Sequence, residues 1–313
     1  MKNKKSERLL ADKYIVFLLA TLCCALWGSA FPAVKTGYSL LGIGSDDTSS
    51  QLLFAGVRFT LAGIFVLVFG SIIRRKPLTH KLSSAPKVAV IALFQTVLQY
   101  SFFYIGLANS SGTNSSIIDS TSTFVAILLS ALVFRQEKLT LKSAIGCLIG
   151  FSGVVLVNLG GISEFHLSGE GAIFISSACY GCSSVFIKAF SKDEDPVTLS
   201  GWQFLLGGTV LCAIGLLLGG KFNAFSAEAA LLISYLAMLS AVAYSVWGLL
   251  LKYNPVSKVT VCGFMIPVFG VAFSALFLGE LDRLNGFVLP SLLLVSVGII
   301  IVNLKPKNKA AEK

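Results

Sequence analysis

Long apolar stretches alternate with short polar segments along almost the whole chain. A transmembrane helix needs about 20 consecutive, predominantly apolar residues to cross about 30 Å of hydrocarbon. The pattern therefore predicts an all-α membrane protein with ten transmembrane helices, and a polar turn at residues 108–112 separates the third from the fourth. The predicted helices cover residues 14–36, 51–73, 87–107, 113–134, 142–159, 169–190, 198–218, 227–250, 257–278 and 285–304.

The positions of the basic residues test this number of helices. Loops on the cytoplasmic side of a membrane protein are enriched in Lys and Arg. Of the 25 Lys and Arg residues, 21 fall in the two tails and in the four loops that ten helices place on the same side as the tails. The opposite loops hold only Lys221 and Arg283. The alternation predicts a multi-pass protein of the inner (plasma) membrane, with a cytoplasmic N-tail (1–13) and C-tail (305–313).

Composition agrees with the bilayer as the main solvent. The chain is 55% hydrophobic and 13% charged, whereas soluble domains carry about 25% charged residues. The mean hydropathy is +0.82. The net charge of +10 is explained by basic helix ends that orient the protein, so we expect no nucleic-acid partner.

An internal repeat divides the chain. Residues 25–35 (ALWGSAFPAVK) and 178–188 (ACYGCSSVFIK) share Ala, an aromatic residue, Gly and Lys at matching positions. Residues 133–140 (VFRQEKLT) and 276–283 (LFLGELDR) align Glu137 with Glu280, and the closing segments GVVLVN (153–158) and GIIIVN (298–303) also match. The prediction is a first five-helix repeat over 14–159 and a second over 169–304.

Five helices per repeat have a physical consequence. Because five is odd, the second repeat enters the membrane from the opposite side, so the two repeats are inverted. Inverted repeats allow one central site to face either side of the membrane when the repeats exchange conformations. The pattern thus favours a transporter that works by alternating access.

Three segments and their order resemble the drug/metabolite transporter superfamily, specifically its EamA-type members. They are WGSAFPAVK (27–35), FAGVRFTLAG (54–63) and PVFGVAFSALFLGE (267–280), the last followed by GIIIVN. The resemblance covers nearly the whole chain and implies ten helices in two inverted repeats and export of amino acids, metabolites or drugs. The chain has Phe124 in the first half where the second half has Pro267, so a helix break there belongs to one half only.

Motifs for catalysis are missing from the sequence. The chain has two histidines, His80 and His166, in predicted loops on opposite sides, and no HExxH, GxSxG or GxxxxGK[ST] motif. We therefore expect no enzyme activity, no cofactor and no metal site. Transport would draw its energy from a gradient.

Three charged residues lie inside or beside predicted helices. A charge at mid-helix costs about 2.5–3.5 kcal/mol on insertion scales. Arg58 and Asp119 lie at similar depths, about 10 Å in at about 1.5 Å per residue, and Lys35 lies at the outer end of the first helix. They predict a polar cluster that binds a charged substrate group or gates the site, with Asp119 as the proton-coupling group. A structural ion pair, and snorkelling of Lys35, stay open.

Uncharged polar and aromatic residues complete the predicted site. Gln95 and Gln99 share a helix face, and Thr123 lies in a polar run of the fourth helix. Trp27 and Tyr180 occupy matching repeat positions near mid-membrane and are expected in the cavity wall. Hydrogen bonding between helices is the alternative for the polar residues.

Two further sets of residues have a structural interpretation. Tyr104 and Trp247 are expected as anchors at the membrane interface. Gly146 and Gly150 would let the fifth helix approach a neighbour in the same chain, while a homodimer stays open.

The sequence thus predicts a secondary transporter that exports small metabolites or amino acids across the cytoplasmic membrane. Its expected partners are a small-molecule substrate, the lipid bilayer and a coupling proton. A multidrug or sugar-linked-metabolite carrier is the alternative within this class. A membrane scaffold or lipid-handling protein is the alternative from another class.

Overall fold

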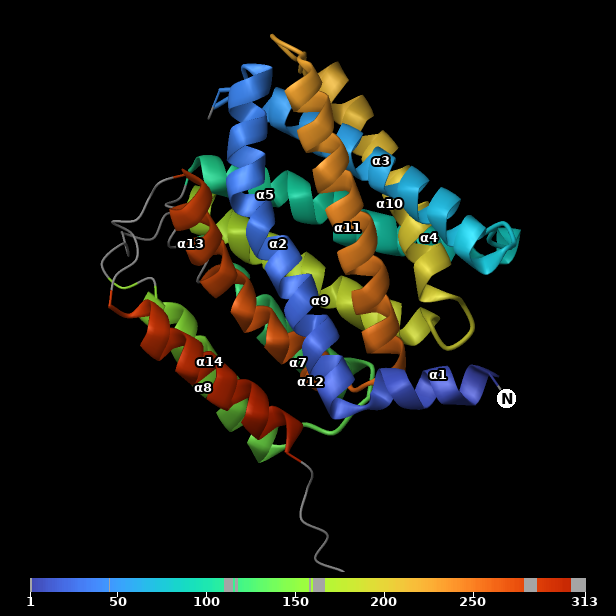
Figure 1. Cartoon of the computed structure of the whole chain (residues 1–313), viewed down its shortest axis with the longest axis vertical. Helices are drawn as coiled ribbons and strands as arrows, with labels where there is room; N and C mark the ends of the chain where they lie inside the picture. The colour runs from blue at the N-terminus through green and yellow to red at the C-terminus, as the bar shows by residue number, and fades with distance from the viewer. Residues whose placement is uncertain are drawn as a thin grey trace, which may run out of the picture.

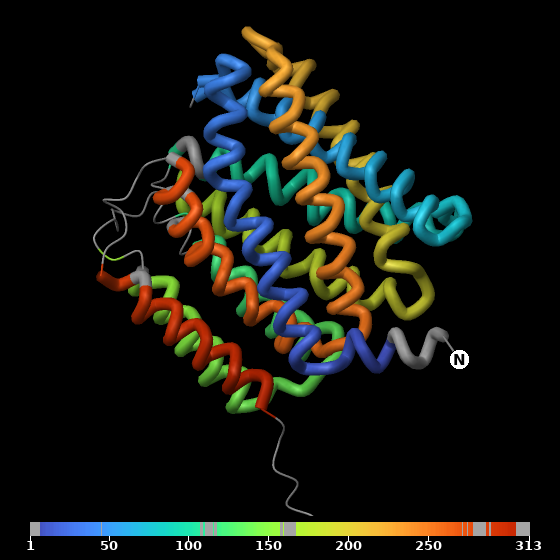
Figure 2. The backbone as a smooth tube through the Cα atoms, viewed as in Figure 1, coloured from blue at the N-terminus to red at the C-terminus, as the bar shows by residue number. Residues whose placement is uncertain are grey.

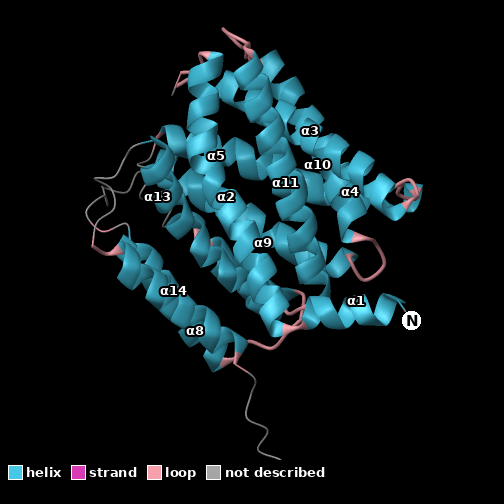
Figure 3. Ribbon diagram, viewed as in Figure 1, coloured by secondary structure: helices cyan, strands magenta, loops and turns pink. Residues whose placement is uncertain are grey.

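The computed structural model describes residues 2–44, 46–109, 115, 118–157, 159, 167–278 and 286–304. Within these ranges all regular secondary structure is helical (Figure 3). The start of the predicted fourth helix, Asn158, Glu280 and the C-tail (305–313) lie outside the described residues. The prediction of an all-α protein is confirmed.

Among the described residues, seven helices are long and apolar enough to cross a membrane. Several consist of consecutive α-, 3₁₀- and π-helical pieces that run on without a break. They are α2 (Lys13–Leu41), α3 (Thr48–Arg74), η1–α4–η2–α5 (Leu82–Ser84, Ala85–Ile91, Ala92–Leu98, Gln99–Ala108), η4–α9 (Leu167–Gly171, Ala172–Phe190), α10 (Pro196–Leu217), α11 (Ala227–Tyr253) and α12–η5–α13 (Val256–Thr260, Val261–Phe264, Met265–Leu278).

Three shorter apolar helices accompany them. They are α7 (Ser122–Leu128) with the π-helical η3 (Leu129–Val133), α8 (Leu141–Val157) and α14 (Val288–Asn303). The seven long and three shorter helices overlap the ten predicted ranges, and Ser122–Val133 is the part of the fourth range (113–134) that forms an apolar helix among the described residues.

The residues before the first span form a helix that the sequence analysis treats as a tail. Helix α1 (Lys2–Ala11) lies crosswise to α2 in Figure 1. Asp12 ends α1 and caps α2, because its carboxylate accepts hydrogen bonds from the backbone N–H groups of Tyr14 and Ile15. Asp47 and Asp195 cap α3 and α10 in the same way.

Glycines allow two helix pairs to pack closely. Helix α3 lies along α10, and α8 lies along α14 (Figure 1). A Cβ atom at Gly56 of α3 would meet the backbone nitrogen of Cys212 at 2.4 Å. A Cβ atom at Gly146 of α8 would meet the carbonyl oxygen of Gly298 at 2.8 Å. The prediction that the Gly146 motif serves packing within the chain is confirmed.

The remaining contacts follow a paired pattern, which the tube in Figure 2 allows the reader to trace. Helix α2 packs against α11 and α13, while α9 packs against α5 and α7. Helix α3 packs against α11, while α10 packs against η2. Each of these contacts made by α2 and α3 of the first half thus has a counterpart made by α9 and α10 of the second.

Candidate functional site

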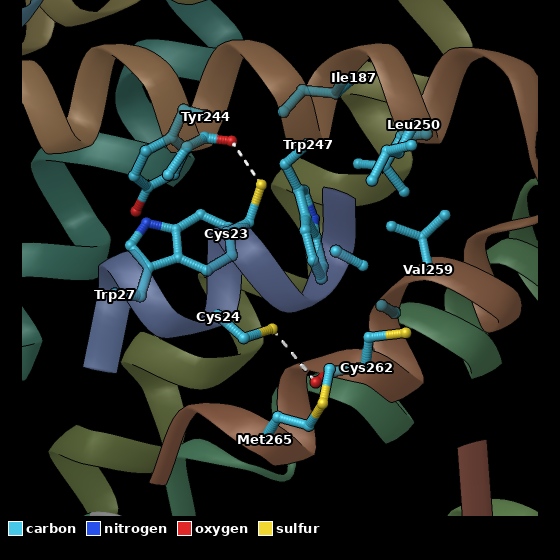
Figure 4. Packing of buried hydrophobic residues seen from close by; sticks show 14 of the residues in the cluster. Cys23, Cys24, Trp27, Ile187, Tyr244, Trp247, Leu250, Val259, Cys262 and Met265 are labelled. Atoms are coloured by element: carbon cyan, nitrogen blue, oxygen red, sulfur yellow. Dashed lines mark hydrogen bonds between the residues drawn. The ribbon is translucent and has the colours of Figure 1, made fainter. Parts of the chain in front are cut away.

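An aromatic cluster surrounds Trp27 of α2 in the middle of the bundle. Its ring lies 5.1 Å from that of Tyr244 and 5.0 Å from that of Trp247, both on α11, in edge-on contacts (Figure 4). The ring of Tyr180 on α9 lies 6.4 Å from Trp27. The structure therefore brings together Trp27 and Tyr180, which occupy matching positions in the sequence repeat.

A second group of rings continues the cluster. The hydroxyl oxygens of Tyr100 on α5 and Tyr244 lie 3.0 Å apart, within hydrogen-bond distance. Phe59 of α3 stacks on Phe204 of α10 at 5.2 Å, and Phe59 also lies 4.4 Å from Tyr100. Helices of both halves thus contribute to one continuous aromatic core.

The expectation that Tyr104 and Trp247 anchor the protein at the membrane interface is wrong. Their exposed fractions are 3% and 2%. Trp247 faces Trp27, and the ring of Tyr104 lies 6.2 Å from that of Tyr100. Position along a helix does not determine which face a residue occupies, and both residues lie on the inward face.

Arg58 of α3 is buried beside the aromatic core, with an exposed fraction of 4%. Its Nη2 atom donates a hydrogen bond to the Oγ atom of Ser240 on α11 at 3.0 Å. Its Nε atom has no hydrogen-bond partner among the described residues. The ring of Phe59 lies 5.0 Å from the guanidinium carbon.

Asp119 does not pair with Arg58 in the part of the chain that the structure describes. Instead, the hydroxyl of Ser177 on α9 donates to the Asp119 Oδ1 atom at 3.3 Å. The two charges share a similar predicted depth but face different helices, α11 and α9. Lys35 is exposed on α2.

The predicted amide and hydroxyl groups are buried. Gln95 lies in the π-helical segment η2, and its Nε2 atom donates to the Ser183 Oγ atom at 3.3 Å. Within the described ranges, the Oε1 atoms of Gln95 and Gln99 accept no hydrogen bond. The hydroxyl of Thr123 on α7 donates to the carbonyl oxygen of Thr260 at 3.0 Å.

Other buried donors near Trp27 also have no partner among the described residues. These are the indole Nε1 atoms of Trp27 and Trp247 and the hydroxyl of Tyr180. Buried polar atoms in proteins are normally hydrogen-bonded. Hydrogen-bond donors and acceptors without partners, clustered around aromatic rings, are suited to bind a small molecule that has both polar groups and an apolar body.

A closer comparison of the halves reveals a correspondence that the sequence analysis missed. Residues 57–63 (VRFTLAG) align with 202–208 (WQFLLGG), which places Gln203 opposite Arg58 and Phe204 opposite Phe59. The hydroxyl of Thr96 donates to the Gln203 Oε1 atom at 2.8 Å, whereas in the other pair Arg58 is the donor and the Ser240 hydroxyl the acceptor. An offset shorter by one residue aligns TVLQYS (96–101) with SAVAYS (240–245) and so pairs Tyr100 with Tyr244. Extending the repeat to these segments would have identified the missed residues.

Arg58 and Asp119 both belong to the first half. Asp119 aligns with Cys262 in the register that aligns Phe124 with Pro267. The thiol of Cys24 donates to the Cys262 carbonyl oxygen at 3.2 Å (Figure 4), at the place corresponding to the contact of Ser177 with Asp119. At these two positions the first half therefore has a charged residue where the second half has a neutral one.

Hydrogen bonds tie separate segments together on one side of the bundle, the side that carries α1. The carboxylate of Glu137, just before α8, accepts hydrogen bonds from the backbone nitrogen of Ser257 at 3.0 Å and from its hydroxyl at 2.8 Å. Lys188 donates to the Asn254 carbonyl oxygen at 2.6 Å, and the Asn254 amide donates to the Leu10 carbonyl oxygen at 2.9 Å. We call these contacts the clasp.

Charged contacts also join two loops on this side. Arg74 lies 2.8 Å from Asp195, and Lys87 lies 3.2 Å from Glu194. The Ser84 hydroxyl donates to Glu194, and together with Lys87 it lowers the pKa of the Glu194 carboxyl from its ordinary value of 4.5. These contacts fix the loop before α4 to the loop before α10.

Two apolar grooves lie away from the aromatic core. One, of about 680 Å³, is lined by residues of α5, η4 and α9, including Phe102 and Phe174. The other, of about 240 Å³, lies between α2 and α11 beside Leu22 and Met238. None of the predicted site residues lines either groove. Among the described residues, no group of three or more His, Cys, Asp or Glu side chains could hold a metal ion.

Among the described residues, seven helices of membrane-spanning length surround a core of aromatic rings and of buried polar atoms that have no hydrogen-bond partner there. This arrangement is that of a multi-pass membrane protein of the carrier type. The family model described as "EamA-like transporter family" matches the chain twice, over residues 14–159 and 167–304. The chain belongs to the EamA-like transporter family.

Relatives at 25–27% identity are named as transporters or as related to WAT1. The chain is 26% identical to the uncharacterized transporter YvbV of Bacillus subtilis, over 94% of this chain and 93% of that protein. It is 25% identical to a probable amino-acid metabolite efflux pump of Salmonella typhimurium, over 90% and 93%. It is 27% identical to a chloroplastic WAT1-related protein of Arabidopsis thaliana, over 81% of this chain and only 61% of that protein.

A solved crystal structure has the same fold. It matches with a TM-score of 0.75 and 17% sequence identity, covering 93% of this chain and 97% of the other. At this identity the likeness concerns the fold alone.

Proposed function

We propose that the protein is a secondary transporter that exports small metabolites or amino acids across the cytoplasmic membrane by alternating access. The family and the Salmonella efflux pump support this class of activity. The observation that carries the proposal is the buried centre around Trp27, where aromatic rings from α2, α9 and α11 meet polar atoms that have no partner in the part of the chain that the structure describes.

Ten transmembrane helices in two inverted five-helix repeats, 14–159 and 169–304, form the proposed architecture. The family model's two matches support the repeat boundaries. The paired packing of α2 with α11 and α13, and of α9 with α5 and α7, supports corresponding roles for the halves. The basic tails and loops support cytoplasmic termini in the inner membrane.

The clasp supports a state in which the proposed cytoplasmic side is closed. Glu137 belongs to the first repeat and Ser257 to the second, so their hydrogen bonds must break if the repeats move apart on this side. Opening the clasp would expose the aromatic core to the cytoplasm. Exchange between these states would give the single site alternating access.

Each predicted residue has a proposed role in binding or gating. Lys35, on an exposed face, would act at the entrance, and Arg58 would bind a charged substrate group. Asp119 would carry the coupling proton, because it is a carboxylate among α7 and α9. The residues that would line the site between them are Trp27, Gln95, Gln99, Thr123 and Tyr180.

Flux into inside-out membrane vesicles tests the proposal. A panel of radiolabelled amino acids and metabolites is offered with and without a proton gradient that is acidic inside the vesicles. We expect gradient-dependent uptake of at least one solute by the wild type and its loss in Asp119→Asn, with equal amounts of protein in the membrane. Absence of uptake across the panel would contradict the transport proposal and favour a scaffold or lipid-handling role. Uptake of dyes or drugs in place of metabolites would favour a multidrug carrier.

A further inference from the structure

Arg58 carries a charge that the packing of its helix does not require. Its counterpart Gln203 occupies the corresponding place on α10, is fully buried, and is held by a hydroxyl of the facing helix just as Arg58 is held by Ser240. A neutral amide therefore suffices to join two helices at this position. The guanidinium of Arg58 adds a full positive charge to the same framework.

That charge is expensive where it lies. Removing an ion from water costs several kcal/mol unless an opposite charge and hydrogen bonds compensate, and charged groups in membrane helices commonly mark substrate pathways. Within the described ranges, no carboxylate lies within 4 Å of Arg58, and Asp119 is held by Ser177 instead. Ser240 supplies one neutral hydrogen bond.

The guanidinium has a free binding edge beside apolar surface. Its Nε atom has no partner among the described residues, and Nη2, on the same edge, bonds only to Ser240. Arginine commonly binds a carboxylate through two parallel N–H groups of one edge. The rings of Phe59 and Tyr100, which lie 4.4 Å apart, adjoin the charge and offer contact to an apolar body.

We propose that Arg58, with Ser240, binds the carboxylate of the substrate, and that the substrate class is organic acids with an aromatic or large apolar body. This inference rests on the proposed transport function and narrows its cargo. The carboxylate would accept hydrogen bonds from Nε and Nη2 of Arg58. Ser240, whose hydroxyl donates to the Leu236 carbonyl oxygen, accepts from Nη2 and orients the guanidinium. The apolar body would lie along the aromatic core toward Tyr244 and Trp27.

The test compares two probes that share a phenyl body and differ in the head group, which is a charged carboxylate in one and a neutral amide in the other. These are 3-phenylpropionate and its neutral amide, 3-phenylpropanamide, and binding to the purified full chain is followed by tryptophan fluorescence. The wild type should bind the acid at least about tenfold more tightly than the amide, because charge-assisted hydrogen bonds are about twice as strong as neutral ones. In Arg58→Gln the ratio should fall to about one, while affinity for the amide is kept.

Two further variants separate charge from folding. Arg58→Lys keeps the charge without the two-pronged edge, and it should retain a preference for the acid at a reduced ratio. Thr96→Val removes the corresponding hydrogen bond in the other half and should leave the ratio at its wild-type value. If Arg58→Gln does not fold, Arg58→Lys and Ser240→Ala carry the comparison, and both should lower the ratio.

The outcomes distinguish this inference from the transport proposal. The carboxylate site is overturned if the wild type binds neither probe, if acid and amide bind equally, or if Arg58 variants leave the ratio unchanged. If vesicles take up solutes while the ratio is independent of Arg58, transport stands and the carboxylate site falls. If the ratio depends on Arg58 but no solute moves, the site stands and transport falls.

Discussion

The clasp leads to a prediction about access to the buried core. The carboxylate of Glu137 accepts two hydrogen bonds from Ser257, at 3.0 and 2.8 Å. A hydrogen bond to a charged group contributes about 1.5–3 kcal/mol net. Glu137 is half-buried, so we take the lower value for Glu137→Gln, which keeps an acceptor but loses the charge. Since about 1.4 kcal/mol corresponds to a factor of ten, the open population should rise about tenfold.

Cys262 reports this opening without an added probe residue. It lies in η5, a few residues beyond Ser257, and its exposed fraction is 1%. A membrane-impermeant maleimide is applied to inside-out vesicles, and modification of Cys262 is followed by mass spectrometry. Glu137→Gln should raise the rate of modification about tenfold. Ser257→Ala, which keeps the bond from the backbone nitrogen, should raise it less.

Glu194→Gln provides the matched control. Glu194 lies on the same side and also accepts from a serine hydroxyl, that of Ser84, but its hydrogen bonds go to the loop before α4. This variant should leave the labelling rate of Cys262 unchanged. The role assigned to the clasp is refuted if Glu137→Gln leaves the rate unchanged, or if Glu194→Gln raises it equally.

Three further predictions concern stability. Gly56→Ala should lower the melting temperature in detergent, because the new Cβ atom meets backbone of α10 and overpacking costs about 1–3 kcal/mol. Gly286→Ala is the control and should not lower it, because a Cβ atom there meets nothing within 4 Å. Equal melting temperatures of the two variants would contradict the packing argument. The pKa of Glu194 is lowered on folding, so its stabilisation is present above the unfolded pKa of about 4.5 and is lost as the pH falls through the folded value. The melting temperature of the wild type should therefore exceed that of Glu194→Gln at pH 7 and approach it near pH 3; a constant difference would refute this. Tyr244→Phe should cost about 1 kcal/mol in unfolding free energy, because it breaks the hydroxyl contact with Tyr100, whereas no change in a denaturant titration would show that the contact contributes nothing.

The sequence predicts the helices well because hydropathy and basic loop residues record where the chain crosses the membrane. The repeat singles out Trp27 and Tyr180 as matching positions near mid-membrane, and their rings lie 6.4 Å apart in the structure. Helix α1 is missed because its composition resembles a basic tail. The structure shows that these residues form a helix that ends at Ala11, next to Asp12, which caps α2.

The side-chain pairing of the charges could not be predicted in the same way. Depth follows from the position along a helix, so Arg58 and Asp119 were placed at one level. Direction follows from how α3, α7, α9 and α11 pack, and this turns Arg58 toward Ser240 and Asp119 toward Ser177. The position of Trp247 was mispredicted for the same reason, because hydropathy does not reveal that this residue lies on the inward face of its helix.

Transport through the aromatic core is the central claim, and uptake by inside-out vesicles carrying Trp27→Ala tests it most directly. Trp27 contacts rings of both α9 and α11, so its truncation removes the wall that the two halves share. We predict that the wild type accumulates at least one metabolite or amino acid under a proton gradient. Trp27→Ala, present in equal amount, should lose at least about nine-tenths of that uptake. This tenfold reduction corresponds to a loss of about 1.4 kcal/mol of interaction free energy. Wild-type rates in Trp27→Ala would contradict the account.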